Sequence, residues 1–325
     1  MVFSGVCIQG ATVARCVQIA EEAERLGYDT GWVPEVQAPD AVTLMAATAM
    51  ATTTLKIATG IIPIYLRDPL LTAMTFATLQ DLSGGRMIAG FGTSTPAIVT
   101  GWHGVPFERP LTRTRAFVDI VKRLLAGERV KSEGEYTIRG ASLRGPVTPP
   151  VPIYLGALNE RMLELAGEVA DGVILNFPTA GYVEWALAAI GRGLKRAGRE
   201  RASIDVVANF RTGPAGFDEF GPSLRRELLS YFTAPVYQKV WRADGWTAEV
   251  DTVSGLWDAG DRAGALAAIP DRFVDAHGVI GTADECRAKV RRYLDAGIDH
   301  AVLFPLADSA GTSERYFETM RAVAP

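Results

Sequence analysis

One junction recurs along this chain and constrains its fold more than any other feature. An amphipathic helix ends on Gly or Ala, passes an Asp, and leads into a short apolar strand. Glycine suits the left-handed end of a helix, and a β-branched or aromatic run suits a buried parallel strand. Each copy is therefore the second half of a βαβ unit. The copies read EEAERLGYDTGWV (21–33), LAGEVADGVIL (165–175) and RRYLDAGIDHAVLF (291–304).

Eight apolar segments are predicted to be strands, with helical patterns between them. Eight strands alternating with helices over 325 residues predict a (β/α)8 TIM barrel, in one domain spanning 1–325. A doubly wound open sheet is the alternative, but no GxGxxG follows the first strand. The predicted strands lie near 3–8, 30–33, 55–60, 87–91, 153–155, 172–175, 204–208 and 301–304.

Two segments are too long for simple connections and are predicted to be insertions. Residues 127–150 have the pattern of a hairpin followed by a Pro-rich return. The segment from about 213 to 278 is rich in aromatic residues and helix signals. We interpret it as a helical subdomain that packs its own core, with a lid over the barrel mouth or an oligomer contact as alternatives.

Composition excludes several classes of protein. A formal net charge of −4 without a long Lys/Arg run argues against a nucleic-acid partner. The first residues lack a signal-peptide pattern, and no apolar run reaches the roughly 18 residues of a membrane span, so we expect a cytoplasmic protein without a membrane partner. Cys7, Cys16 and Cys286 lack metal-ligand spacing, so we expect ordinary thiols and no metal site.

The residues that follow the predicted strands are poor in charge, although a barrel of this kind places its site there. Glu35 is the only carboxylate among them, which argues against a two-carboxylate glycosidase. No GxSxG, P-loop or HExxH motif occurs. Chemistry that needs a strong protein nucleophile is therefore disfavoured, and a bound organic cofactor would supply what the side chains lack.

Three turns have the residues that such a cofactor needs. Gly90–Ser94 combines glycine with small hydroxyl residues, and Leu155–Asn159 precedes a predicted helix N-terminus. Backbone N–H groups in such turns bind phosphate. The apolar turn Gly60–Pro63 suits a wall behind an aromatic ring. Together the three turns predict a site for a cofactor with a planar ring and a phosphate.

Three segments resemble the bacterial-luciferase-like superfamily of flavin and deazaflavin oxidoreductases, and the resemblance covers nearly the whole chain. Within it the chain most resembles the branch that uses the deazaflavin coenzyme F420 rather than FMN. The middle segment is the most specific of the three. The segments are AERLGYDTGWVPE, LKIATGIIPIYLRDPLLTAMTFATLQDLSGGRMIAGFGTS and VPIYLGALNERMLELAGEVADGVILNF.

This resemblance implies where the cofactor binds. It places a non-prolyl cis peptide behind the ring, at the bond Thr59–Gly60 with Ile61 adjacent, and it puts Glu35 near the ring. It assigns the cofactor's side chain and phosphate to the turns after the fourth and fifth strands. The cofactor-binding residues predicted are Thr59, Gly60, Ile61, Thr93, Ser94, Gly156, Ala157, Leu158 and Asn176.

The chain departs from one branch of that superfamily. Its sugar-phosphate dehydrogenases have Asp-His after the second strand and a Glu shortly after the fourth, where this chain has Glu35-Val36 and Thr95. Oxidation of a sugar alcohol is therefore disfavoured. Glu35 and His103 are the candidate catalytic residues, as proton donors, and a structural role is the alternative for both.

The leading hypothesis is an F420-dependent oxidoreductase. It would transfer a hydride between the deazaflavin and a small, mostly uncharged organic substrate with a C=C, C=N or C=O bond. An FMN-dependent monooxygenase of the same superfamily is the alternative, and a cofactor-free binding or structural barrel is an alternative of another class. The Ala/Thr/Met-rich segments at 41–51 and 70–79 would either cover the barrel or pack a homodimer partner.

Overall fold

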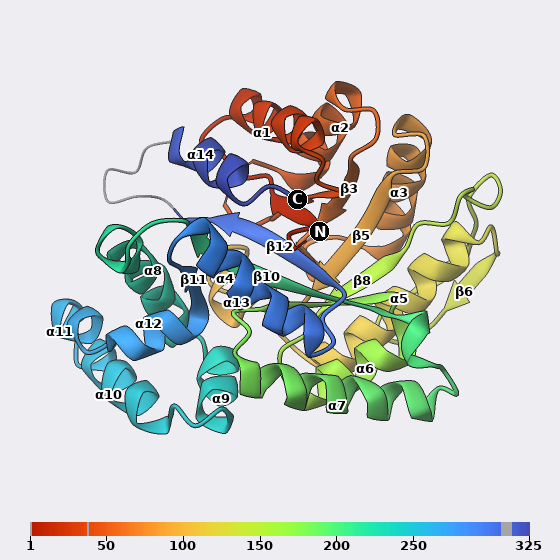
Figure 1. The fold of residues 1–325 in the computed structure, drawn as a ribbon. Coiled ribbons are helices and arrows are strands. Elements are labelled where there is room, and N and C mark those ends of the chain that lie inside the picture. The colour runs from red at the N-terminus through yellow and green to blue at the C-terminus, as the bar shows by residue number, and fades with distance from the viewer. Residues whose placement is uncertain (1, 38, 307–313) are drawn as a thin grey trace.

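A computed structural model describes residues 2–37, 39–306 and 314–325. Eight parallel strands close into a barrel inside a ring of helices, which confirms the predicted TIM-barrel fold (Figure 1). The barrel closes because β12 pairs with β1 and β10 pairs with β9. In barrel order the strands are β1 (Gly5–Cys7), β2 (Thr30–Val33), β3 (Lys56–Thr59), β5 (Met87–Gly92), β8 (Ile153–Gly156), β9 (Gly172–Asn176), β10 (Asp205–Gly213) and β12 (His300–Pro305).

The helices around the barrel begin where short polar side chains cap them. Thr12, Asp40 and Asp68 each accept a hydrogen bond from a backbone N–H in the first helical turn. The first helix ends at Gly27 in the left-handed conformation, as its junction predicts. The helices are α1 (Val13–Leu26), α2 (Ala41–Ala51), α3 (Pro69–Leu82), α4 (Pro96–Val99), α5 (Pro110–Leu125), α6 (Glu160–Val169), α7 (Ala180–Arg196), α13 (Ala283–Asp295) and α14 (Glu314–Ala322), with a 3-10 turn at Arg201–Ser203.

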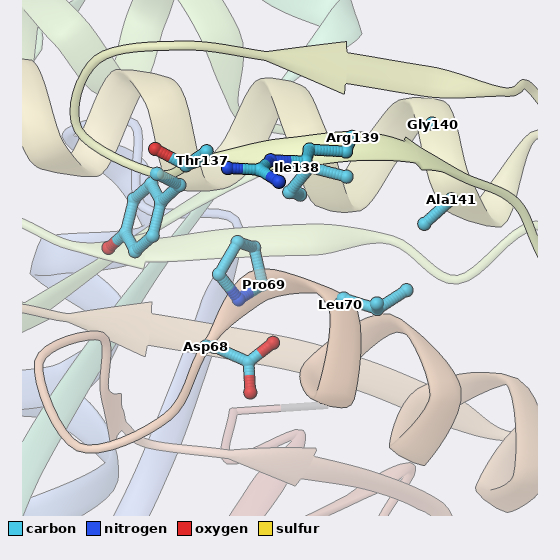
Figure 2. Close-up of a pocket in the computed structure, with 9 residues that line it drawn as sticks. Asp68, Pro69, Leu70, Thr137, Ile138, Arg139, Gly140 and Ala141 are labelled. Carbon is cyan, nitrogen blue, oxygen red and sulfur yellow. The ribbon is translucent and has the colours of Figure 1, made fainter.

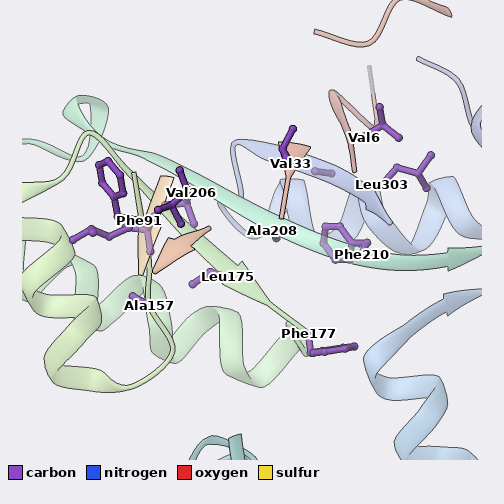
Figure 3. Packing of buried hydrophobic residues seen from close by; sticks show 14 of the residues in the cluster. Val6, Val33, Phe91, Ala157, Leu175, Phe177, Val206, Ala208, Phe210 and Leu303 are labelled. Atoms are coloured by element: carbon purple, nitrogen blue, oxygen red, sulfur yellow. The ribbon is translucent and has the colours of Figure 1, made fainter. Parts of the chain in front are cut away.

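The barrel interior is filled by side chains from seven strands. Gly5 on β1 leaves room for the large indole of Trp32, because a Cβ atom at Gly5 would lie 2.8 Å from its Nε1. The outward-facing side chains of the strands pack under the surrounding helices (Figure 3). The interior cluster consists of Trp32, Ala58, Ile88, Tyr154, Ile174, Val207 and Val302.

Both predicted insertions are present. The first is an antiparallel hairpin of β6 (Val130–Ser132) and β7 (Ile138–Ala141). The second is a group of helices beside the barrel, followed by β11 (Gly278–Ile280) (Figure 1). It packs its own aromatic core, in which Trp241 contacts both Phe232 and Phe273. Its helices are α8 (Phe217–Phe232), α9 (Pro235–Ala243), α10 (Thr247–Asp258), α11 (Arg262–Ala267) and α12 (Asp271–His277).

One strand is longer than predicted. The sequence pattern ended the seventh barrel strand at residue 208, but β10 continues to Gly213. The added residues pair with β12 from Asn209 to Thr212 and with β11 from Arg211 to Gly213, and the helical insertion brings β11 alongside. The insertion is therefore joined to the barrel by a sheet ladder.

Three further features concern the cysteines, the metal-ligating side chains and the lengths of the helices. The three cysteines are buried free thiols. No group of metal-ligating side chains occurs among the described residues. Within the same residues, no helix has both the length and the apolar character needed to cross a bilayer.

Candidate functional site

The three predicted cofactor turns meet at one side chain, Ile61. A Cβ atom at Gly92, where β5 ends, would lie 3.0 Å from Cγ1 of Ile61, and one at Gly156, where β8 ends, would lie 3.1 Å from Cγ2. The turn also forms the two-residue strand β4 (Ile62–Pro63), which pairs with Phe91 and Gly92. We refer to Gly60, Ile61, Gly92 and Gly156 as the glycine wall.

The non-prolyl cis peptide lies one bond later than predicted. It joins Gly60 to Ile61, not Thr59 to Gly60. The Thr59–Gly60 peptide still belongs to the barrel ladder, since the N–H of Gly60 donates to the carbonyl of Val33 at 2.9 Å. The chain leaves the strand geometry only after that bond.

The hydroxyl of Thr59, a predicted cofactor contact, is occupied by the barrel. It donates to the carbonyl of Gly90 at 2.7 Å and accepts from the N–H of Gly90 at 2.8 Å. Thr59 is also fully buried. Its side chain therefore ties β3 to β5 beneath the glycine wall.

The two predicted phosphate turns are both partly exposed. Thr93 and Ser94 follow β5 directly, and Ser94 has a positive φ of 57°. At the second turn, Asn159 precedes α6 without a side-chain capping bond, so the first turn of this helix is not capped by its own chain. The N–H of Ala157, however, donates to the carbonyl of Ile174 at 3.2 Å, so this amide is not open to an anion.

The two candidate proton donors lie in different surroundings. One carboxylate oxygen of Glu35 accepts from Nη2 of Arg67 at 2.9 Å and from the N–H of Ala41 at 3.2 Å. Arg67 also pairs with Asp40, whose pKa is lowered: burial opposes this shift, but hydrogen bonds from Thr43 and the charge of Arg67 outweigh it. Glu35 thus connects the loop after β2 to the turn after β3, whereas His103 is exposed to solvent in the loop after α4.

Across the barrel mouth, β9 and β10 end in polar side chains. Nη1 of Arg211 donates to Oδ1 of Asn176 at 2.6 Å, and Nε of Arg211 donates to Glu227 on α8 at 2.9 Å. Asn176 in turn donates to the hydroxyl of Tyr237 on α9 at 2.8 Å. Asn209 lies in register with Asn176 on the neighbouring strand. We refer to Asn176, Asn209 and Arg211 as the polar wall.

The charge of Arg211 is buried but compensated. Its guanidinium lies between two aromatic rings, 4.1 Å from the ring centre of Phe177 and 4.4 Å from that of Phe304. Burial by itself would lower the pKa of Arg211, but the carboxylate of Glu227 reverses this and leaves the pKa above its ordinary value. Burial also raises the pKa of the Cys7 thiol to about 12, so this thiol is neutral and unreactive.

The sequence placed Asn176 and the run Asn209 to Arg211 just past their predicted strands, at the barrel mouth, but it gave a cofactor role to Asn176 alone. The strand that carries Asn209 and Arg211 was expected to end at residue 208, before either residue. The signal that could have shown their shared face is the alternation ANFRTG, in which polar residues at 209 and 211 flank an apolar one. Side chains two residues apart on a strand share a face, so both follow Val207 into the barrel.

A groove of about 510 Å³ lies elsewhere, outside the barrel. It separates the start of α3, at Asp68–Leu70, from the hairpin strand β7 (Figure 2). None of the predicted site residues lines it. The barrel mouth, with a glycine wall facing a polar wall, is therefore the candidate active site.

Comparisons with known proteins cover nearly the whole chain. The sequence profile of the family described as luciferase-like monooxygenase matches residues 3–300. A 5,10-methylenetetrahydromethanopterin reductase from Methanolobus tindarius is 30% identical over 307 residues, which is 93% of each chain. A protein from Mycobacterium tuberculosis, provisionally named a coenzyme F420-dependent oxidoreductase, is 32% identical over 327 residues, covering 92% of this chain and 91% of its own.

The fold is also shared with a solved structure. The coenzyme F420-dependent tetrahydromethanopterin reductase from Methanopyrus kandleri superposes with a TM-score of 0.82. The superposition covers 98% of this chain and 97% of that one, at 24% sequence identity. At this identity the match concerns the barrel architecture alone.

Proposed function

The chain belongs to the luciferase-like monooxygenase family, and we propose that within it this protein is a coenzyme F420-dependent oxidoreductase. The reaction proposed is hydride transfer to or from a small, mostly uncharged organic substrate with a C=C, C=N or C=O bond. The observation that carries the proposal is the convergence of three backbone turns on Ile61. The two curated relatives described above, whose names specify a reductase and an oxidoreductase, support the class of reaction.

The glycine wall suits a planar ring with an anionic tail. A side chain at Gly92 or Gly156 would contact Ile61, so these glycines keep the backbone open on that side. We propose that Gly60 and Ile61 lie against the ring and that Thr93, Ser94 and the run Gly156 to Leu158 hold the tail. Asn176 is proposed at the far edge of the ring site. Thr59 would act by holding β3 to β5 rather than by direct contact.

Deazaflavin coenzymes accept and donate a hydride at a ring carbon, so the protein itself has to supply position and electrostatics. The glycine wall fixes one face of the site, and the buried interior of the barrel excludes water below it. The polar wall offers hydrogen-bond donors and acceptors on the opposite side. Hydride transfer at such a site needs no nucleophilic side chain.

Two side chains near the barrel mouth are candidates for the proton donor. Glu35 is bound by Arg67 and would have to release that contact to donate a proton. His103 is free of that restraint but lies in an exposed loop. We propose His103 as the donor and Glu35 as a residue that positions the turn after β3. His103→Gln should then lower kcat much more than Glu35→Gln does. A larger loss of kcat in Glu35→Gln would instead identify Glu35 as the proton donor.

Spectral titration of the purified chain with F420 and with FMN tests the proposed cofactor. Saturable binding of F420 with weak or undetectable binding of FMN is the expected result. Binding of FMN without F420 would contradict the proposal and favour a flavin-dependent monooxygenase, which the family description also accommodates. Binding of neither would favour the cofactor-free barrel.

We also propose that the protein is a cytoplasmic homodimer. The outer helices α2 and α3 carry exposed apolar side chains, with Met50 71%, Leu71 48% and Met74 50% exposed. Neither helix has a distinct polar face, which is typical of helices covered on both sides. Sedimentation of the wild type as a dimer, and of Met74→Glu as a monomer, would support this interface.

A further inference from the structure

Asn209 presents an unsatisfied polar atom to the barrel mouth. Its side chain is only 5% exposed, and its Oδ1 accepts no hydrogen bond from any of the described residues. It follows Val207 of the interior cluster on the inward face of β10 and lies level with Asn176 on β9. A buried acceptor left without a partner destabilises the fold, so such an atom calls for a ligand that donates to it.

Arg211, two residues further along the same face, has donors to spare. A guanidinium carries five N–H groups. Three of the groups on Arg211 donate, to Glu227, Asn176 and Tyr231, which leaves two. Phe177 and Phe304 both lie against the guanidinium, and the remaining N–H groups point outward in its plane. A ligand atom that uses them must therefore approach edge-on.

The charge balance selects the kind of ligand. Glu227 already neutralises Arg211, so an anion bound there would add a second negative charge beside the carboxylate. A cation would be repelled by the guanidinium. An uncharged group with an acceptor for Arg211 and a donor for Asn209 satisfies both residues.

We propose that Asn209 and Arg211 form a substrate subsite for an uncharged amide-type edge, in which a carbonyl oxygen or imine nitrogen lies beside an N–H or O–H group. This inference rests on the proposed function, because it places the substrate opposite the ring wall in the same barrel mouth. The subsite is separate from the glycine wall: it is formed by β10, next to β12 and the helical insertion, whereas the glycine wall follows β3, β5 and β8. A deazaflavin ring carries similar edge chemistry, so the test has to separate substrate from ring.

Three ring compounds of similar size serve as probes of the full chain by ligand-observed NMR titration. They are 2-piperidone, which has adjacent C=O and N–H groups, cyclohexanone, which has C=O alone, and cyclohexanecarboxylate, which is an anion. We expect 2-piperidone to bind the wild type about fivefold or more tightly than either of the others. Tighter binding of the carboxylate, equal binding of the lactam and the ketone, or no binding of any probe would overturn the proposal.

Asn209→Leu keeps the branched shape of the side chain, although leucine is larger, and removes the amide. We expect it to abolish the preference for 2-piperidone while cyclohexanone binds as before, and a preference that persists would overturn the subsite. F420 titration of the same variant shows whether Asn209 binds the amide-type edge of the substrate or that of the deazaflavin ring. An F420 affinity within about twofold of the wild type supports a substrate subsite, whereas a tenfold loss would show that the amide serves the ring. If the wild type fails to bind F420 but retains an Asn209-dependent preference for the lactam, the proposed function fails and the subsite stands.

Discussion

The two sides of the barrel mouth are built on opposite principles. The glycine wall depends on side chains that are absent, since even a methyl group at Gly92 or Gly156 would contact Ile61. The polar wall depends on a buried charge, that of Arg211, which Glu227 and two aromatic rings stabilise. The glycine wall depends on shape and the polar wall on electrostatics. Added side-chain volume should therefore disturb the glycine wall, and a removed charge should disturb the polar wall. This difference gives the two sides of one opening different chemistry.

The largest effect is expected directly beneath the glycine wall. A Cβ atom at Gly90 would lie 1.8 Å from the carbonyl oxygen of Thr59, which is backbone and cannot turn aside. Gly90→Ala should therefore destabilise the protein by about 4 kcal/mol or prevent its folding, as measured by chemical denaturation. Gly191→Ala is the matched control: Gly191 lies within α7 with open space around it, so alanine there should stabilise by about 0.5–1 kcal/mol. Equal stability of the two variants would mean that β3 and β5 are not packed as described.

Removal of the charge that compensates Arg211 should destabilise the polar wall. Glu227→Leu leaves the guanidinium of Arg211, which is 6% exposed, without its counter-charge. We expect a loss of about 3 kcal/mol in the free energy of unfolding, at the lower end for a broken buried pair because Glu227 is itself partly exposed. The double variant Glu227→Leu/Arg211→Met removes both charges and should recover part of the loss. No recovery would mean that the ion pair does not govern this wall.

The insertion that supports the polar wall should be sensitive to acid. Burial lowers the pKa of His277 on α12 to about 4, so the folded protein holds it neutral, while the unfolded chain protonates it below about 6.5. Stability is therefore lost as the pH falls from 6.5 towards 4, by about 2 kcal/mol between pH 7 and pH 5. His277→Phe should remove this dependence. Glu22, whose pKa Arg25 lowers to about 2, acts in a more acidic window and does not interfere.

Hydrogen exchange can locate this acid effect. At pH 5, after correction for intrinsic rates, amides of α12 should exchange faster relative to those of the barrel strands than at pH 7. Uniform loss of protection across β3, β5 and α12 would contradict a local response of the insertion.

A smaller effect is expected on the glycine wall itself. A Cβ atom at Gly156 would lie 3.1 Å from a methyl group of Ile61, a side chain that can move by a few tenths of an ångström. Gly156→Val should therefore fold, yet bind F420 about tenfold more weakly than the wild type in a fluorescence titration. An unchanged affinity would place the cofactor's tail elsewhere.

The smallest effect concerns one hydrogen bond on the polar side. Tyr237→Phe removes the hydroxyl that accepts from Nδ2 of Asn176 at 2.8 Å. We expect a cost of about 1 kcal/mol in stability and no change in F420 affinity beyond about twofold. A large loss of F420 affinity in this variant would mean that the polar wall also binds the cofactor, so that the two walls form one site.

The sequence predicted the barrel, both insertions and the three turns that converge on Ile61, because these follow from local periodicity and from glycine placement. It placed the cis peptide one bond early, because the ladder bond of Gly60 to Val33 cannot be read locally. Glu35 pairs with Arg67, which is far away in the chain, so the sequence pattern did not predict this ion pair. Asn209 and Arg211 were expected just past a strand but received no role, because the contacts of Arg211 with Asn176 and Glu227 join segments that are separate in the sequence.

A crystal structure of the chain with F420 bound would show which side of the barrel mouth holds the ring. We expect one face of the deazaflavin ring in contact with Gly60 and Ile61, the tail beside Thr93, Ser94 and Gly156, and the amide of Asn209 left facing the space opposite. A ring that instead lies against Asn209 and Arg211, with no contact to Ile61, would contradict the assignment of the two walls.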